Sequence, residues 1–446
     1  MDEAPRAEFS TGGDPPDGTR PTEGAEVVVI GGGPAGSTAA HLLARAGRRV
    51  VLLEREHFPR FHIGESLLPF NMPLLEQLGV VDAIERAGSV HKHGARFVTG
   101  DGSYVKSVYF RDGLEKGPAQ IYHVVRSEFD TILLRAAADA GADVREGERV
   151  EGARREGDTW TIAVERSADR GRYELRAPFL LDASGRDTFL AQQFRTKRMA
   201  EQHRRAAIYA HYRGVKRDPG QDAGNIVVVA LTNGWFWVIP LAGGVDSIGL
   251  VVDGEAYRRT RLSPEDALEH ALAACPALRE RTAAAERISP VRTTSNYSYR
   301  TTTASGDGYL TAGDAYGFID PIFSSGVWLA MQGGERAAET IDLCLADPRA
   351  APALLARYDR RSRRALSRYW TVVEHFYRPE FMDIFMQPSD RWQLRPAITS
   401  VLAGVTSERL GLRARLALLY LVVRLQRYVR MRAPLPRTSA FADASA

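Results

Sequence analysis

Short runs of apolar residues, separated by a glycine-rich turn and a helical segment, predict a mixed α/β fold for the first part of the chain. Residues 27–30 are all apolar, which is typical of a strand buried on both faces. A glycine-rich turn and an alanine- and leucine-rich helix follow, and Gly47 ends that helix. Residues 50–53 form a second apolar run that closes with Glu54. Strand, turn, helix and strand in this order make one βαβ unit.

Later regions extend this pattern. Residues 126–140 have the composition of a helix, and residues 177–182 form another apolar strand. Alternating and β-branched residues over 206–253 predict an antiparallel sheet, a second layer separate from the first fold. An apolar run at 308–312 then returns to the first fold. From residue 353 onward the apolar side chains fall largely on one stripe of a helix.

Composition narrows the class of protein. Of the 446 residues, 44% are hydrophobic and 26% are charged, which are ordinary values for a soluble globular protein with a large core. Lys and Arg number 59 against 55 Asp and Glu, and this small excess does not indicate a nucleic-acid binder. Cys275 and Cys344 are isolated. Their isolation excludes a disulfide framework, a redox dithiol and a zinc knuckle, and it fits a reducing cytoplasm.

Neither end of the chain carries a membrane signal. Residues 1–24 are rich in Gly, Pro, Asp and Thr, lack an apolar stretch and predict a disordered leader. The longest apolar run, 416–423, lies between Arg415 and Arg424. It is far shorter than the ~20 residues of a membrane helix. We therefore expect a cytoplasmic protein without a membrane span.

The sharpest local signal is the glycine-rich turn GGGPAG at 31–36. Its first glycine permits a tight turn, its third lets the backbone approach a pyrophosphate, and its last lets helix and strand pack closely. The N–H groups at the positive end of the helix would hold the pyrophosphate, and the acid after the second strand would accept bonds from a ribose. A glycine-rich turn without a ligand is the alternative. The candidate dinucleotide-binding residues are Gly31, Gly33, Ala35, Gly36 and Glu54.

A second segment, TAGDA at 311–315, predicts the flavin half of such a site. An aspartate at a strand end, before a Gly-rich turn and a helix, can hold the ribityl hydroxyls of a flavin. Alone this would be a common turn, but paired with the first motif it indicates FAD rather than NAD. No second GxGxxG stands in a suitable context, so a stably bound NADPH domain is not visible. The candidate residues of this half are Arg126, Asp182, Gly313 and Asp314.

Three segments resemble the flavin-dependent halogenases. The first, FPRFHIGESLLP at 58–69, is similar to the segment after the second strand in these enzymes and in their geranylgeranyl-reductase relatives. The second, WFWVIP at 235–240, matches the halogenase WxWxIP motif and is the most specific of the three. The third, GDAYGFIDPIFSSG at 313–326, is similar to their second flavin segment. The likeness extends over about 26–425 and is closest to the pyrrole and phenol halogenases.

The resemblance implies a fold and a division of the chain. We expect a glutathione-reductase-like FAD-binding fold, which is a ββα sandwich with a parallel sheet. An antiparallel β-sheet substrate domain and a C-terminal helical region would complete it. The expected parts are a leader at 1–24, a discontinuous FAD-binding domain at 25–105, 120–190 and 300–345, a substrate domain at 106–119 and 191–299, and a helical region at 346–446.

Two tryptophans stand two positions apart in the second segment. Residues i and i+2 of a strand point to one face, so the two rings would form a wall. Ordinary packing of two core tryptophans is the alternative. The resemblance implies that this wall separates the flavin from the organic substrate. The residues assigned to it are Ser66, Trp235, Trp237, Ile239, Pro240 and Phe323.

Lys92 falls where similar halogenases have their required lysine. The resemblance implies that reduced FAD, O₂ and chloride give hypochlorous acid, which travels behind the wall to this lysine. There it either forms a chloramine or is polarised by a hydrogen bond. A chloramine needs a neutral amine, which an unperturbed pKa of ~10.4 almost excludes at pH 7 but which burial would favour. A solvated lysine between His91 and His93 is the alternative.

Ser325 and Gly326 are the expected halide site, because backbone N–H groups at the start of a helix suit an anion. The alternative is that the serine only caps the start of the helix, and an N-cap and a halide site can also occur together. Phe323 stands where, by the resemblance, tryptophan halogenases have a glutamate. We therefore expect a phenol or a pyrrole, free or tethered to a carrier protein, rather than free tryptophan.

The predicted function is FADH₂-dependent chlorination or bromination of an electron-rich aromatic ring in secondary metabolism, such as antibiotic biosynthesis. A separate flavin reductase would supply FADH₂. The sequence contains no set of histidines with acidic partners, so we expect no metal site. Two rivals stay open: an aromatic hydroxylase, which would use NADPH itself, and a prenyl-lipid reductase. The basic stretch 413–430 could hold the latter at a membrane surface.

Overall fold

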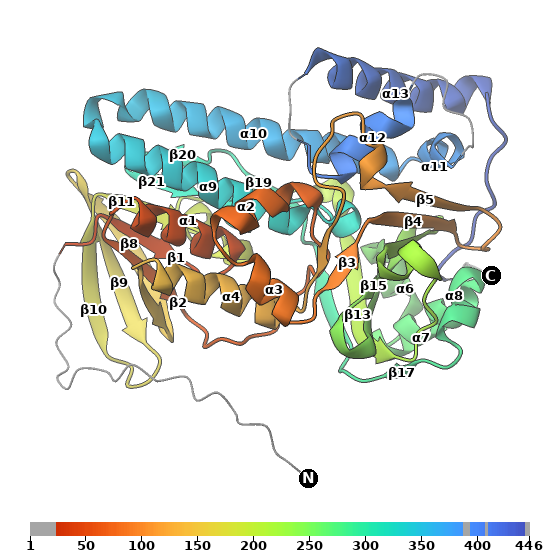
Figure 1. Cartoon of the computed structure of the whole chain (residues 1–446), viewed down its shortest axis with the longest axis horizontal. Helices are drawn as coiled ribbons and strands as arrows, with labels where there is room; N and C mark the ends of the chain where they lie inside the picture. Colours follow the sequence, from red (N-terminus) through yellow and green to blue (C-terminus); the bar gives the residue numbers. More distant parts are fainter. Residues whose placement is uncertain (1–23, 387–392, 406–408, 442–446) are drawn as a thin grey trace, which may run out of the picture.

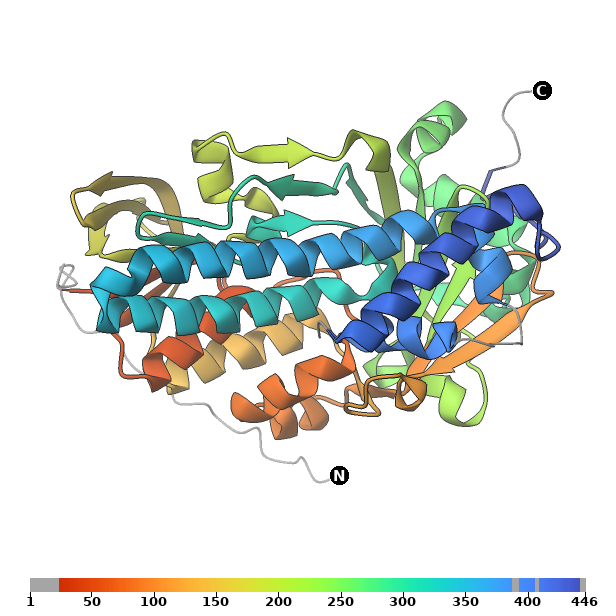
Figure 2. The same ribbon diagram turned by 90° about the horizontal axis from the view of Figure 1, so that it is seen from above.

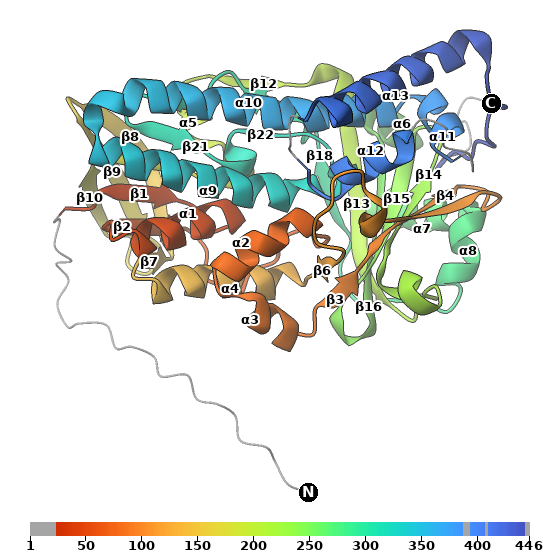
Figure 3. The same cartoon turned by 45° about the horizontal axis from the view of Figure 1, so that its top comes forward.

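The computed structural model describes residues 24–386, 393–405 and 409–441. The leader expected at 1–24 lies outside the described residues, apart from Gly24 itself. Figure 1 shows two β-rich bodies side by side, with two long helices above the first body and shorter C-terminal helices above the second. The same two bodies can be followed from a second direction in Figure 3.

The first body is built on a six-stranded sheet of order β20-β21-β11-β1-β2-β7. All neighbouring strands in it run parallel except β20 and β21. Its strands are β1 (Val27–Ile30), β2 (Val50–Glu54), β7 (Asp143–Glu146), β11 (Phe179–Asp182), β20 (Ser305–Gly306) and β21 (Tyr309–Thr311). Strands from distant parts of the chain therefore lie side by side in one sheet.

Both faces of this sheet are covered, which explains why its central strands are apolar throughout. Val27 belongs to the same apolar cluster as Leu43 on the helical face, whereas Val28 clusters with Trp160 on the opposite face. The helices are α1 (Pro34–Arg45), α4 (Arg126–Asp139) and α9 (Ser325–Ala346), and the opposite layer is a sheet of β8 (Glu148–Glu156), β9 (Thr159–Arg166) and β10 (Arg172–Ala177). The expected mixed α/β class is confirmed.

The second body is built on an eight-stranded sheet of order β17-β13-β16-β15-β14-β4-β5, with β18 paired to β13. Its strands run antiparallel except for the parallel pair β14 and β4. The strands are β4 (Gly94–Thr99), β5 (Val105–Tyr109), β13 (Arg205–Arg213), β14 (Ile226–Ala230), β15 (Gly234–Pro240), β16 (Val245–Asp253), β17 (Glu286–Arg287) and β18 (Arg292–Ser295). An antiparallel sheet was the expectation for residues 206–253.

The pairing of β4 differs from the expected division of the chain, which placed residues up to 105 in the FAD-binding part. Ala95 instead pairs with Ile226 of β14 and with Val108 of β5. Because β4 is hydrogen-bonded on both edges inside the large sheet, the chain enters the second body before residue 94. Sequence periodicity could not show this, since a short apolar strand carries no mark of its partner.

One face of the large sheet is covered by helices α6 (Gly254–Thr260), α7 (Pro264–Ala274) and α8 (Pro276–Thr282). Helix α7 starts where its sequence favours a start: Pro264 occupies the first turn, and Ser263 Oγ accepts from the Asp266 backbone N–H. On the other face, Trp235 and Trp237 join the apolar cluster that also contains Val27 of the first body. A single core therefore spans both bodies.

Short elements connect the two bodies. A two-stranded antiparallel ribbon is formed by β3 (Val90–Lys92) and β6 (Ile121–His123). A three-stranded sheet contains β12 (Lys197–Met199), β19 (Tyr299–Thr301) and β22 (Gly317–Phe318). The short helices are α2 (Met72–Gln77), α3 (Val81–Arg86) and α5 (Phe189–Gln193).

The described residues of the C-terminal part form four helices, of which the last ends at Val429. Helix α10 (Ala351–Phe376) runs along α9, and α11 (Pro379–Phe385), α12 (Leu394–Leu402) and α13 (Leu410–Val429) lie over the β4–β5 end of the large sheet (Figure 2). The Phe385 ring meets Phe97 of β4 edge-on, with centroids 4.9 Å apart. In the described part of the chain, no helix is long and apolar enough to cross a membrane.

Candidate active site

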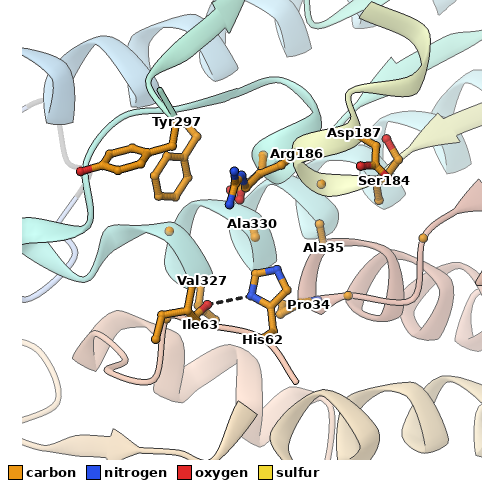
Figure 4. Close-up of a pocket in the computed structure, with 18 of the residues that line it drawn as sticks. Pro34, Ala35, His62, Ile63, Ser184, Arg186, Asp187, Tyr297, Val327 and Ala330 are labelled. Carbon is orange, nitrogen blue, oxygen red and sulfur yellow. Dashed lines mark hydrogen bonds between the residues drawn. The ribbon is translucent and has the colours of Figure 1, made fainter. Parts of the chain in front are cut away.

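A cavity of about 1000 Å³ lies between the two bodies. Its lining extends from the glycine-rich turn after β1 to Trp235 and Trp237 of β15. In Figure 4, His62 and Ile63 reach into it from one side, and Arg186 approaches from the other. The cavity thus joins the two regions that the sequence motifs single out.

The glycine-rich turn has the close packing expected of a dinucleotide site. A Cβ on Gly36 would lie 1.9 Å from the Gly31 carbonyl oxygen, so only glycine lets helix α1 approach the turn. Gly31 itself has a φ of 99°, which side-chain-bearing residues rarely adopt. Gly33 lines the cavity, precedes α1 and gives it no side-chain cap. The first N–H groups of α1 are therefore available to phosphate oxygens.

Glu54 lies at the end of β2 and lines the cavity. One carboxylate oxygen accepts from the Gly32 backbone N–H at 2.7 Å, and the other accepts from the Glu56 N–H at 2.9 Å. Each carboxylate oxygen has a further lone pair, so Glu54 can still accept from a ribose hydroxyl. Its backbone bonds fix the carboxylate in place.

Arg126 and Asp314 line the same cavity further along. Arg126 is held by Asp130 through hydrogen bonds of 2.8 and 2.9 Å and by the carbonyl of Ile63 at 2.9 Å. Burial raises the pKa of Asp314 to about 6, and the charges of Arg126 and Arg186 oppose that rise. A carboxyl group with such a pKa can accept or donate a hydrogen bond, which suits polyhydroxylated ligands.

Three residues of the expected FAD set, namely Gly36, Asp182 and Gly313, are absent from the cavity lining, and each has a local structural role. Asp182 is fully buried, and its carboxylate accepts from the backbone N–H groups of Ser184 at 3.0 Å and Leu190 at 2.8 Å. It shapes the turn after β11. Gly313 is a packing position, because a Cβ there would lie within 3.1 Å of Ala330. The remaining residues fit a dinucleotide such as FAD, with donors at one end and carboxylates along the cavity.

The segment before α9 offers an anion site. Ser324 precedes the helix with a left-handed φ of 55°, and it makes no side-chain cap. Ser324 and Gly326 line the cavity, whereas Ser325 is buried and does not. The uncapped N–H groups at the start of a 22-residue helix therefore lie beside the cavity.

Trp235 and Trp237 line the cavity as a pair of rings with centroids 5.7 Å apart. Trp237 fits because Gly249 stands opposite it; a Cβ there would lie 2.1 Å from the indole. Its Nε1 donates to Ser247 Oγ at 3.1 Å. Ile239 and Ser66 also line the cavity. The pair is therefore both packed in the core and part of the cavity wall.

Two of the residues assigned to the wall stand away from the cavity. Pro240 ends β15 and is absent from the lining. Phe323 packs edge-on against Phe376 of α10, with centroids 5.6 Å apart, and it is also absent from the lining. Phe323 therefore belongs to the apolar layer between the cavity and the C-terminal helices.

Trp235 is tied to the C-terminal region by a buried polar network that the sequence did not reveal. Its Nε1 donates to the Tyr377 hydroxyl at 2.8 Å, and that hydroxyl donates to Asp320 Oδ2 at 2.8 Å. Tyr297, which lines the cavity, donates to the same oxygen at 3.3 Å. The Arg205 guanidinium lies 3.4 Å from the Tyr377 ring centroid. These contacts fix the plane of the Trp235 indole.

Lys92 lies behind the cavity wall and is only 2% exposed. Its Nζ donates to Ser66 Oγ at 2.8 Å and to the Leu67 carbonyl at 2.9 Å, and it lies 5.2 Å from the Phe110 ring centroid. Burial lowers the pKa of Lys92 to about 7. A substantial fraction of the amine is therefore neutral at pH 7, and the solvated-lysine interpretation does not fit this structure.

Buried Glu65 and partly buried His211 form a pair that sequence reasoning missed. Glu65 Oε1 is 2.8 Å from His211 Nε2, and Oε2 has no hydrogen-bond partner among the described residues. Glu65 lines the cavity and is 1% exposed. A glutamate inside a motif could have signalled a role, but its partner stands on β13, far along the chain.

The histidines at positions 62, 91 and 93 differ in their burial and contacts. His62 lines the cavity, bonds to the Ile63 carbonyl at 2.7 Å (Figure 4), and has its pKa lowered to about 4 by burial. His91 is exposed, and His93 is partly buried. Within the described ranges, no group of three or more His, Cys, Asp or Glu is placed to hold a metal ion.

Comparisons with known proteins agree with this geometry. A family described as FAD binding domain matches residues 24–374. The chain is 35% identical over 320 residues to a 1H-pyrrole-2-carbonyl-[peptidyl-carrier protein] brominase of Pseudoalteromonas luteoviolacea, covering 71% of this chain and 77% of the relative. It is 34% identical to a tryptophan 2-halogenase of Chondromyces crocatus, covering 79% and 67% respectively. The structure of flavin-dependent brominase Bmp2 superposes with a TM-score of 0.81 at 29% identity, over 92% of this chain and 100% of that one.

Proposed function

This chain belongs to the flavin-dependent halogenases, and on that premise we propose that it halogenates an electron-rich aromatic ring by way of Lys92. The observation that carries the proposal is the position of the Lys92 amine. The amine is buried, its pKa is lowered to about 7, and it donates a hydrogen bond to Ser66, which lines the cavity. A neutral amine in that place suits the capture of a small electrophilic oxidant.

The enzyme uses FAD, and residues along the cavity would hold it: the α1 N-terminus for phosphates, Glu54 for a ribose, and Arg126 and Asp314 further along. Bound FAD in its reduced form would supply two of the four electrons that O₂ accepts; the halide ion would supply the other two and be oxidised to hypohalous acid. The N–H groups at the start of α9, beside Ser324 and Gly326, would bind that halide.

The tryptophan pair supports a relayed oxidant rather than direct hydroxylation. An aromatic hydroxylase needs its substrate beside the flavin, whereas here Trp235 and Trp237 occupy the cavity wall and Lys92 stands behind Ser66. Hypochlorous acid or its bromine analogue is small enough to pass such a wall. An aromatic ring is held back by it, so the halogen reaches the ring only through Lys92.

For the substrate we propose a pyrrole or a phenol, free or held on a carrier protein. The brominase relative acts, by its name, on a pyrrole-2-carbonyl group of a peptidyl-carrier protein. Phe323 places an apolar ring, not a carboxylate, before α9. A phenol or pyrrole is activated by its own OH or NH and needs no added carboxylate. Because a tryptophan 2-halogenase is also similar, free tryptophan is the comparison substrate.

The test supplies purified protein with FAD, NADH, a separate flavin reductase, O₂ and either chloride or bromide. Phenol, pyrrole, pyrrole-2-carbonyl carrier protein and tryptophan are offered, and mass spectrometry reads the halogen isotope pattern. We expect a halogenated phenol or pyrrole that requires the reductase. NADPH oxidation by the protein alone, stimulated by an aromatic substrate and yielding a hydroxylated product, would contradict the proposal and establish the hydroxylase.

A separate reductase delivers FADH₂, and the reaction belongs to secondary metabolism. We also propose a glutathione-reductase-like arrangement for the FAD-binding part and a cytoplasmic location, which the two free, buried cysteines suit. The prenyl-lipid reductase alternative predicts co-sedimentation with liposomes, and we expect none.

A further inference from the structure

Replacing a ring hydrogen by a halogen releases a proton, and the site therefore needs a base. In the net reaction, an aromatic C–H and hypochlorous acid give the aromatic chloride and water. The carbon gives up its proton after the C–Cl bond has formed. The contacts of Lys92 described above, namely Ser66 Oγ, the Leu67 carbonyl and the Phe110 ring, provide no base for a carbon-bound proton. The need for this base follows from the proposed function.

The β3–β6 ribbon places one histidine beside Lys92. Val90 pairs with His123, and Lys92 pairs with Ile121. Opposite residues of an antiparallel pair share a face, and so do residues two apart on one strand. Lys92 and His123 are therefore diagonal neighbours on one face, at a spacing of about 7–8 Å that long side chains bridge. His123 is also bridged to Ser66, the acceptor of the Lys92 amine.

His123 has an unusual environment for a histidine. It is fully buried, and neither ring nitrogen has a hydrogen-bond partner of normal geometry among the described residues. Buried polar groups are nearly always paired, so such a group points to a role or a ligand. Burial lowers the pKa of His123 well below its ordinary value, and the positive charge of Lys92, when that amine is protonated, lowers it further; the Gly224 backbone opposes this in part, and Arg217 adds a smaller lowering. The imidazole is therefore neutral, with a lone pair to offer.

We propose that His123 accepts the proton that leaves the aromatic ring and returns it to the atom that gave up the halogen. If Lys92 carries the halogen, the N–Cl bond breaks and the C–Cl bond forms. The ring proton then passes from carbon through the imidazole to the lysine nitrogen, which restores the amine. If hypochlorous acid is only polarised, the O–Cl bond breaks and the same proton completes a water molecule. Both routes balance, and His123 ends the cycle neutral.

The test compares His123→Gln and His123→Asn with wild type in the full enzyme with FAD, reductase, halide and O₂. The control is His91→Gln, which changes a histidine of the same ribbon that is exposed and points to the opposite face, against the Tyr122 ring. Ring-deuterated and ordinary pyrrole-2-carbonyl carrier protein, and likewise phenol, compete in one vessel. Mass spectrometry gives the ratio of the two products. A trap for hypochlorous acid is assayed separately.

We expect halogenation to fall on the order of 10²-fold in both His123 variants, as for loss of a general base. Deuterium should slow the variants but not wild type, because proton loss becomes limiting. A purely structural role for His123 would not move the isotope ratio. Oxidant trapping and FAD binding should stay at wild-type levels.

A wild-type rate with no deuterium effect in His123→Gln, or an equal loss in His91→Gln, overturns the inference alone. Absence of both a halogenated ring and trapped oxidant in wild type overturns the proposed function and this inference with it. Because oxidant trapping is measured apart from the ring reaction, the two failures are distinguishable.

Discussion

Ser66 Oγ accepts a 2.8 Å hydrogen bond from Lys92 Nζ, and this bond links the wall of the cavity to the residue behind it. Ser66 belongs to the lining of the cavity, whereas Lys92 does not. An oxidant made in the cavity would therefore meet the serine hydroxyl first and the amine next. This contact joins the FAD-binding part of the chain to the place where we put the halogen transfer.

Replacing Lys92 by methionine should abolish halogenation of the ring while leaving flavin oxidation intact. Methionine keeps the volume of the buried stem but removes the amine that, as we propose, takes up the oxidant. We expect hypochlorous acid to escape and to be trapped in solution, with reduced flavin consumed at the wild-type rate. Absorbance of the flavin and mass spectrometry of the product measure the two steps separately.

The matched control is Lys216→Met, which alters a lysine whose side chain is mostly exposed and paired with Glu280. It should halogenate at the wild-type rate. Ring halogenation that persists in Lys92→Met would remove the lysine from the mechanism.

Stability should rise with pH between about 7 and 10.5 because of Lys92. Burial lowers the pKa of its amine from 10.5 to about 7 in the folded protein. Over this interval the unfolded chain binds the extra proton, so the free energy of unfolding increases with pH. The contribution of this group is at most about 1.4 kcal/mol per pH unit. Urea unfolding at several pH values should show a flatter dependence for Lys92→Met than for wild type, and equal slopes would contradict the burial of a neutral amine.

The fraction of oxidant transferred to the ring should also increase as pH rises through 7. Lys92 is neutralised by burial without a carboxylate partner, which favours the amine over the ammonium form. The amine is the form that can become a chloramine. The measurement is the ratio of halogenated product to trapped hypochlorous acid at pH 6 to 8.5. A ratio that falls with pH would instead assign the ammonium ion as a hydrogen-bond donor to the oxidant.

Tyr377→Phe should loosen the tryptophan wall. The change removes the hydroxyl that accepts from Trp235 and donates to buried Asp320. Leaving such groups under-satisfied costs about 1–3 kcal/mol of stability, which a lower urea midpoint reports. We also expect more hypochlorous acid in solution per flavin oxidised. Tyr428→Phe, at a side chain that is 78% exposed, is the control.

Much of the first body could be predicted from sequence because its signals are local. The apolar runs at β1 and β2, the glycine turn and the start of α9 each depend on a few neighbouring residues. The turn motif alone predicts a glycine at position 36, and the structure shows that a Cβ there would clash with the Gly31 carbonyl oxygen. The physical rules for turns and buried strands depend only on such short stretches of sequence, so they were sufficient for these elements of the first body.

The parts that were missed depend on pairings across the chain. The alignment of Lys92 with His123 requires the register of two strands about 30 residues apart. The bond from Glu65 to His211 joins the first body to the large sheet. Asp182 stands where a ligand-binding carboxylate could be expected, but its oxygens accept from the backbone N–H groups of Ser184 and of Leu190 in α5, a fold-back that local composition does not specify.

Gly36→Ala should prevent FAD binding. The added Cβ would lie 1.9 Å from the Gly31 carbonyl oxygen, which forces α1 away from the turn that would hold the phosphates. We expect purified Gly36→Ala to lack the flavin absorbance and fluorescence changes that wild type shows on titration with FAD. Gly152→Ala serves as the control, since a Cβ there meets nothing within 4 Å. Normal FAD affinity in Gly36→Ala would contradict the assignment of this turn.

The position of β21 beside β11 has a consequence for synthesis of the protein. Residues 309–311 are translated long after β1, β2, β7 and β11, yet they complete the parallel sheet. While the ribosome makes the intervening large sheet, the outer edge of β11 has no neighbour, and an unpaired strand edge is a template for aggregation. Nascent chains halted before residue 309 should therefore need chaperone protection that chains released after α9 do not.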